Sequence, residues 1–169
     1  MKRGFFVFSF LFIFSVFPSF AISSDTRFSL GTDICFESEV FYKPYFRKSL
    51  NITLRTDESP WCFAANTWLF DSAFVVTADN WFVNEPLSKA VNYYLFWGIS
   101  GGLGFNDFSV GTGARAGGGI DWFLLDDKNL ELYWQGAWNP YLGLENDDGL
   151  KPFVRPLCFI FSSGARWWF

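Results

Sequence analysis

Residues 93–105 read Tyr93-Tyr94-Leu95-Phe96-Trp97-Gly98-Ile99-Ser100-Gly101-Gly102-Leu103-Gly104-Phe105, and this stretch decides the fold. Large apolar residues take alternate positions: Tyr93, Leu95, Trp97, Ile99, Leu103 and Phe105. The positions between them include Gly98, Ser100, Gly102 and Gly104. A period of two residues is typical of a β-strand with one apolar face and one polar face.

The same period recurs along most of the chain. Residues 108–122 repeat it, with Val110, Ile120 and Trp122 on one face and Arg115 and Asp121 on the other. Counting alternating segments predicts eight strands, at residues 28–37, 46–55, 61–70, 73–82, 93–105, 108–122, 130–139 and 157–169. The acidic stretch from Glu145 to Gly149 is predicted to be a loop, and we expect no loop longer than about seven residues.

The composition indicates where the apolar faces lie. Half of the residues are apolar and 23% are aromatic, including 9 Trp and 24 Phe, yet no segment after residue 21 is apolar enough to span a membrane as a helix. In hydrocarbon every backbone polar group must be paired, so a spanning sheet must close on itself. Alternating strands of about ten residues with many aromatic side chains therefore predict an all-β, antiparallel, up-and-down transmembrane barrel.

The N-terminus has the order of a secretory signal peptide. Lys2 and Arg3 precede the apolar stretch 5–17, and small residues at Ser19 and Ala21 predict cleavage after Ala21. The alternative is a retained membrane anchor, although the apolar stretch is shorter than a spanning helix needs. The prediction is thus a cleaved segment, 1–21, followed by one barrel domain, 22–169. Cleavage leaves 11 basic and 17 acidic residues, a net charge of −6, which excludes nucleic acid as a partner.

The final residues carry a family resemblance. The last predicted strand alternates and ends in Trp167-Trp168-Phe169, which resembles the assembly signal of bacterial outer-membrane barrels. With the signal peptide and eight strands, the region 22–169 resembles the small barrels typified by the OmpA transmembrane domain, OmpX and OmpW. The resemblance implies Sec-dependent export to the outer membrane of a Gram-negative-type bacterium. Its implied partners are outer-membrane lipid, periplasmic chaperones and the barrel-assembly machinery.

The predicted inward faces carry charges of both signs. We expect a lumen charge network of Asp33, Glu37, Arg47, Arg55, Asp79, Arg115, Asp121, Glu131 and Arg166. Four cations face five anions, and an unpaired ion in a narrow interior is costly, so these charges are expected to pair across the lumen. A selective pore more often carries an excess of one sign. The inward glycines between Gly98 and Gly119 leave two alternatives open, packing of bulky neighbours or a small cavity.

Three cysteines allow one pairing. Cys35 and Cys158 lie on the first and last predicted strands, which should be neighbours, so a disulfide between them is an alternative to two small buried thiols. The chain has no His, which removes Ser-His and Cys-His pairs and His-based metal sites. We therefore expect no enzyme activity, no cofactor and no metal.

Two functions remain open at this stage. In the first, which resemblance to OmpW implies, the barrel binds or passes small hydrophobic solutes as a porin. In the second, it is a non-conducting structural or surface-interaction barrel, similar to an adhesin. A secreted, soluble, lipocalin-like barrel is the control, and its aromatic residues would face inward.

Overall fold

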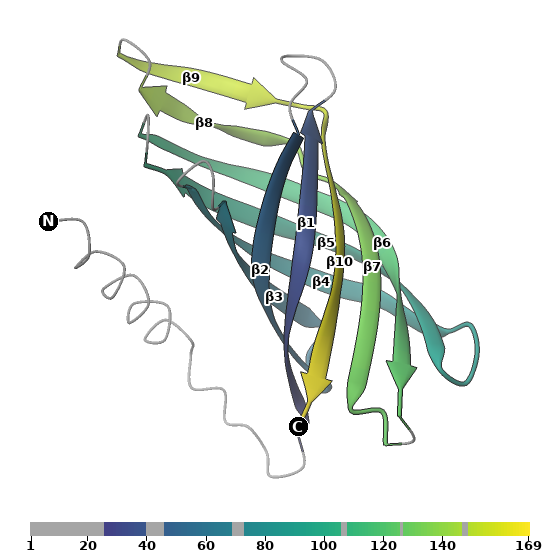
Figure 1. Cartoon of the computed structure of the whole chain (residues 1–169). Helices are drawn as coiled ribbons and strands as arrows, with labels where there is room; N and C mark the ends of the chain where they lie inside the picture. The colour runs from purple at the N-terminus through teal and green to yellow at the C-terminus, as the bar shows by residue number, and fades with distance from the viewer. Residues whose placement is uncertain (1–25, 40–45, 69–72, 106–107, 126, 147–148) are drawn as a thin grey trace, which may run out of the picture.

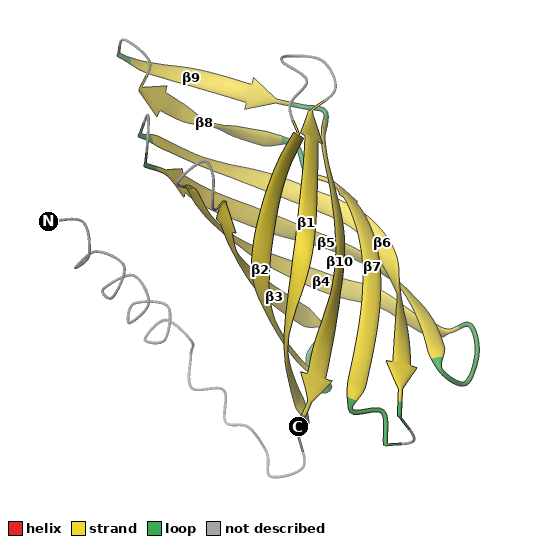
Figure 2. Ribbon diagram, in the orientation of Figure 1, coloured by secondary structure: helices red, strands yellow, loops and turns green. Residues whose placement is uncertain are grey.

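The computed structural model describes residues 26–39, 46–68, 73–105, 108–125, 127–146 and 149–169. The predicted signal peptide, 1–21, lies outside the described residues. Within the described part of the chain, no helix is long and apolar enough to cross a membrane. All regular elements in it are strands (Figure 2).

Ten strand segments are present in the described chain. They are β1 (Phe28–Glu39), β2 (Phe46–Thr56), β3 (Trp61–Trp68), β4 (Ala73–Pro86), β5 (Val91–Gly104), β6 (Ser109–Leu124), β7 (Leu130–Trp138), β8 (Tyr141–Asn146), β9 (Leu150–Arg155) and β10 (Cys158–Trp168).

These segments form one closed antiparallel barrel (Figure 1). Neighbouring strands pair in chain order from β1 to β7, and β10 lies between β7 and β1. The β1–β10 pairing closes the wall, in register from Ser29 opposite Trp168 to Glu39 opposite Cys158. The predicted up-and-down barrel is therefore confirmed, including the contact between its first and last strands.

The last hairpin is longer than the sequence pattern predicted. β7 and β8 follow β6 in one continuous register, interrupted only at Asn139 and Pro140. β9 pairs with β8 and leads into β10. The ten segments thus make eight strands of a barrel wall. The predicted acidic loop, Glu145–Gly149, contains the end of β8 and residues 147–148, which lie outside the described residues. The prediction missed the strands on either side of it, because residues 141–146 and 150–155 were assigned to no strand but form β8 and β9 at the top of Figure 1.

The two ends of the barrel differ. Phe28 and Phe169 lie at one end, called here the terminal end, together with the β2–β3, β4–β5 and β6–β7 connections (Figure 1). The opposite end, called the distal end, carries the β8–β9 hairpin. Stacked rings of Phe28 and Phe169, with centroids 5.0 Å apart, and a hydrogen bond from Phe169 N to Phe28 O complete the seam at the terminal end.

The outer wall is mainly apolar where side chains are described, although Thr112 on β6 and Ser163 on β10 also face outward. On β5 the outward Leu95, Trp97 and Ile99 are 43%, 50% and 59% exposed, while the inward Phe96 is 1% exposed. β1 and β10 alternate in the same way. The predicted faces are confirmed, and the lipocalin-like pattern, with aromatic residues mainly inside, does not fit this wall.

The fourth strand departs from the predicted pattern. β4 continues past Phe82 to Pro86, and its register against β5 shifts between Trp81 and Val83. Such a bulge adds one residue and re-aims the side chains next to it. Phe82 is 60% exposed and faces outward as predicted, and Trp81, on the same side as Asp79, points inward and is 4% exposed.

Candidate functional site

The interior of the barrel is the candidate site, because it gathers the polar groups that the wall excludes. Eight of the nine charged residues predicted for the lumen have described side chains, and all eight are buried: Asp33, Glu37, Arg55, Asp79, Arg115, Asp121, Glu131 and Arg166. Arg47 pairs with Glu37 through its backbone, but its side chain lies outside the described residues.

Arg115 and Asp79 form a two-pronged ion pair in the middle of the lumen. Arg115 Nε and Nη2 donate to the two carboxylate oxygens of Asp79 at 2.8 Å and 3.1 Å. Both side chains are nearly inaccessible. Paired donors aimed at one carboxylate fix orientation as well as charge, so this pair braces β6 against β4.

Arg166 is the centre of a second cluster. Its side chain pairs with Glu131, and its Nε donates to Thr53 Oγ1 at 3.2 Å. The guanidinium also lies 3.8 Å from the centre of the Tyr133 ring, a cation–π contact. Trp168 Nε1 donates to the other oxygen of Glu131 at 2.7 Å. A buried cation is therefore surrounded by partners.

Glycines make these contacts across strands possible. Gly98 on β5 lies between Asp79 on β4 and Arg115 on β6, in register with both. A Cβ at Gly98 would lie 2.3 Å from Asp79 Oδ1, so a larger residue would block the ion pair. The inward glycine that the sequence left undecided between packing and cavity serves packing at this position.

Three further glycines repeat this geometry. In each case the glycine lies between two inward side chains that bond to each other over it. The pairs are Tyr133 and Asp33 over Gly164, Arg166 and Thr53 over Gly31, and Tyr94 and Gln135 over Gly119. Side chains two strands apart can thus join because the strand between them presents no Cβ.

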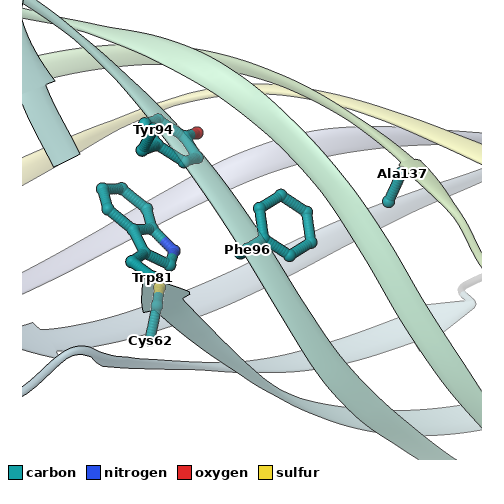
Figure 3. Close-up of a cluster of buried hydrophobic side chains, with 5 residues drawn as sticks. All are labelled: Cys62, Trp81, Tyr94, Phe96 and Ala137. Carbon is teal, nitrogen blue, oxygen red and sulfur yellow. The ribbon is translucent and has the colours of Figure 1, made fainter. Parts of the chain in front are cut away.

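An aromatic cluster fills the terminal half of the lumen. The rings of Trp81 and Tyr94 are stacked, with centroids 3.6 Å apart, and Phe96 lies next to Tyr94 (Figure 3). The Arg55 guanidinium lies 3.9 Å from the centre of the Trp81 ring. Sequence reasoning missed this cluster, although strict alternation along 93–105 places Tyr94 and Phe96 on the inward face.

A pocket occupies the distal half. Its cavity volume is about 80 Å³, and it opens to solvent at its mouth. Its lining combines Asn66 and Ser100 with the glycines 102, 104 and 111 and with Tyr141, Phe153 and Arg155 of the β8–β9 hairpin. A smaller space of about 10 Å³ lies between the two ion-pair clusters, and Arg115 borders both this space and the distal pocket. The ion pair of Arg115 therefore forms the floor of the open pocket.

The cysteines are not joined. Cys35, Cys62 and Cys158 are free and buried. Cys35 lies opposite Ser162, whereas Cys158 lies opposite Glu39, four residues further along β1. Four residues of strand span about 13 Å, more than the roughly 7 Å that a disulfide bridges between Cα atoms. The expectation that the two cysteines lie at similar heights is therefore wrong.

The terminal residues predicted as an assembly signal divide between the two faces. Trp167 and Phe169 face outward, 44% and 60% exposed, while Trp168 faces the lumen and is 5% exposed.

Among the described residues, no group of three or more Cys, Asp or Glu side chains is arranged to hold a metal ion.

Comparisons with known proteins bear on the fold. No family model and no curated protein match the chain. Among solved structures, the chain is similar to the crystal structure of Neisserial surface protein A (NspA), with a TM-score of 0.56 and 14% sequence identity. The match covers 85% of this chain and 97% of that one. At this identity the likeness supports the barrel fold alone, and the resemblance to OmpA, OmpX and OmpW stays a prediction.

Proposed function

We propose that this protein is an integral outer-membrane barrel whose lumen does not conduct, and that its distal pocket binds a small solute at the cell surface. Export by a signal peptide, insertion by the barrel-assembly machinery and residence in a Gram-negative-type outer membrane are parts of the proposal. The barrel acts by binding and not by catalysis.

The apolar wall supports insertion into lipid. Trp97, Ile99 and Phe161 on the outer wall are each at least half exposed. If these side chains faced water, the barrel would be poorly soluble. Closure of the sheet leaves no unpaired edge along the wall, which is the condition for a sheet to cross hydrocarbon. The structural likeness to a protein whose name describes it as a surface protein agrees with this location.

The closed lumen carries the proposal that the barrel does not conduct. Between the pocket and the terminal end, the path passes Arg115 with Asp79, then Arg166 with Glu131, then the ring of Trp81 under Arg55. All these side chains are at most 7% exposed. An eight-stranded barrel is just wide enough for side chains to fill. The alternative of a porin that passes hydrophobic solutes is disfavoured by this charged and aromatic filling.

Permeability tests the closed lumen. Liposomes carrying the refolded barrel should retain a small hydrophilic solute and a hydrophobic probe as well as liposomes without protein do. The Arg115→Ala variant should also stay sealed, because the Arg166 and Trp81 layers remain. The proposal would be overturned if either solute passed through the native barrel and if blocking the lumen reduced that passage.

Labelling of intact cells tests membrane orientation. Short turns of outer-membrane barrels face the periplasm, so the distal hairpin should face outward. The side chains of Asn146, in the hairpin, and Glu58, at the terminal end, are both exposed. A membrane-impermeant maleimide should therefore label Asn146→Cys on intact cells but not Glu58→Cys. The native cysteines are buried and give little background. Labelling of Glu58→Cys alone would reverse the orientation and overturn the proposal.

A further inference from the structure

We infer that the distal pocket binds a neutral sugar ring, held by hydroxyl contacts on one side and by the aromatic wall on the other. This inference names the ligand class of the solute site and therefore rests on the proposed function.

The first observation is an unsatisfied amide. Asn66 on β3 is 3% exposed, and its Oδ1 is buried without a hydrogen-bond partner. It lines the distal pocket. A buried acceptor without a partner costs about 1–3 kcal/mol, so a ligand that donates to it gains that contact. The ligand should therefore carry an O–H or N–H donor.

The second observation is a flat apolar wall. Tyr141 lies against the glycines of β5 and β6: a Cβ at Gly111 would lie 2.4 Å from its Cε1, and one at Gly102 would lie 2.8 Å from its hydroxyl. Phe153 lies against Gly143 in the same way and stacks on Tyr141, with centroids 6.0 Å apart. Glycines thus allow two rings to lie along the inner wall. Such a wall accepts the apolar face of a ring.

The charges of the pocket disfavour an ionic ligand. Both arginines that line the pocket already have carboxylate partners. Arg115 pairs with Asp79. Arg155 Nε lies 3.7 Å from Glu39 Oε2. A charged ligand would have to compete with these partners or be buried beside them, which is costly. A neutral ligand avoids that cost.

A sugar ring combines the three properties. Its hydroxyls both donate and accept, so they suit Asn66 together with hydroxyl groups such as that of Ser100. Its C–H face is apolar and can lie on an aromatic ring. The pocket is small, about 80 Å³, and open at its mouth, so it would hold part of one ring and not a longer saccharide. The sugar is either free in solution or the headgroup of a glycolipid, because both present the same chemistry.

Binding should be measured on the refolded full-length mature barrel in detergent micelles, with folding checked by its heat-dependent gel mobility. Saturation-transfer NMR with glucose, galactose and N-acetylglucosamine should show binding. Glucosamine and glucuronate, similar in size but charged, should bind more weakly. A glycolipid in mixed micelles forms a second arm, and binding there alone would identify the headgroup as the source.

Two variants test the site. Asn66→Ala should weaken binding about tenfold, because it removes the acceptor. Gly102→Ala should also weaken it, since the new methyl displaces Tyr141. Gly101→Ala is the matched control: its Cβ would face outward, with the nearest atom 4.0 Å away, and binding should be unchanged.

Three results would overturn the inference: no neutral sugar binds in either arm, charged analogues bind as well as neutral ones, or Asn66→Ala binds like the native barrel. If sugars fail to bind while liposomes stay sealed, the closed outer-membrane barrel survives and only the ligand class falls. If liposomes leak through the native lumen, the proposed function fails whatever the sugars do.

Discussion

Arg115 on β6 reaches Asp79 on β4 across an intervening strand, and the contact passes over Gly98, whose missing Cβ leaves the space. The two ends of the ion pair are 36 residues apart in the chain but share one level of the lumen. The inward glycine of β5 therefore makes possible the ion pair that blocks the lumen.

Gly98→Ala should destabilise the barrel. The added methyl would lie 2.3 Å from Asp79 Oδ1 and 2.4 Å from the Ala78 carbonyl oxygen, so either the ion pair or the β4–β5 spacing must change. We expect a loss of about 2–4 kcal/mol in the free energy of unfolding. Urea unfolding in lipid vesicles measures it. Gly101→Ala on the outer face serves as control and should stay within about 0.5 kcal/mol of the native barrel.

The ion pair should show strong coupling. Arg115→Met alone leaves Asp79 buried without its cation, and we expect a loss of about 3–5 kcal/mol. Adding Asp79→Leu removes that unpaired charge, so the double variant should be more stable than Arg115→Met. A double-mutant cycle by urea unfolding gives the coupling energy. Additive losses would mean that the two side chains do not act as a pair.

A charge on the outer wall should separate a membrane barrel from a water-soluble one. Ile99 faces outward near the middle of β5 and is 59% exposed. In lipid, Ile99→Arg should cost about 2–4 kcal/mol, because Arg at this depth loses its hydration. Glu58→Arg in a turn at the terminal end should cost little. Folding yield and unfolding in vesicles report both. If Ile99→Arg left the stability of the barrel in vesicles unchanged, membrane insertion would be contradicted.

The thiols should be protected and separate. Cys35 and Cys158 are each 1% exposed and Cys62 is 7% exposed. The folded barrel should therefore resist a maleimide reagent, and three thiols should react after unfolding. Mild oxidation should not produce a Cys35–Cys158 bridge, because the β1–β10 register holds them four residues apart. Formation of that bridge without loss of folding would show that the register is different.

Trp81 should stabilise the terminal half of the barrel. Its ring lies between Tyr94 and the Arg55 guanidinium, and it is 4% exposed. Trp81→Ala should cost about 3–5 kcal/mol, since it leaves a cavity and exposes Arg55 to an empty space. Phe82→Ala, next to it but outward, is the matched control and should cost less. Equal losses would indicate that the cluster contributes no more than the outer wall.

Much of the fold was readable from local pattern. Alternation has a period of two residues and depends only on which side of the wall a position faces, so the faces of β1, β5, β6, β7 and β10 were predicted correctly. Closure followed from the chemistry of backbone groups in lipid. The inward location of Asp79, Arg115 and Arg166 also followed, because a charged residue in alternating surroundings belongs to the polar face.

What the sequence alone determined about this protein is therefore the wall and its two faces. Partners inside the lumen depend on the register between strands far apart in the chain, and only the closed structure sets it. That register joins Arg115 to Asp79 over Gly98, and it separates Cys35 from Cys158. The hairpin of β8 and β9 was hidden for a related reason. Pro140, Gly149 and Pro152 interrupt the local pattern, while pairing with β6 keeps this segment in the sheet.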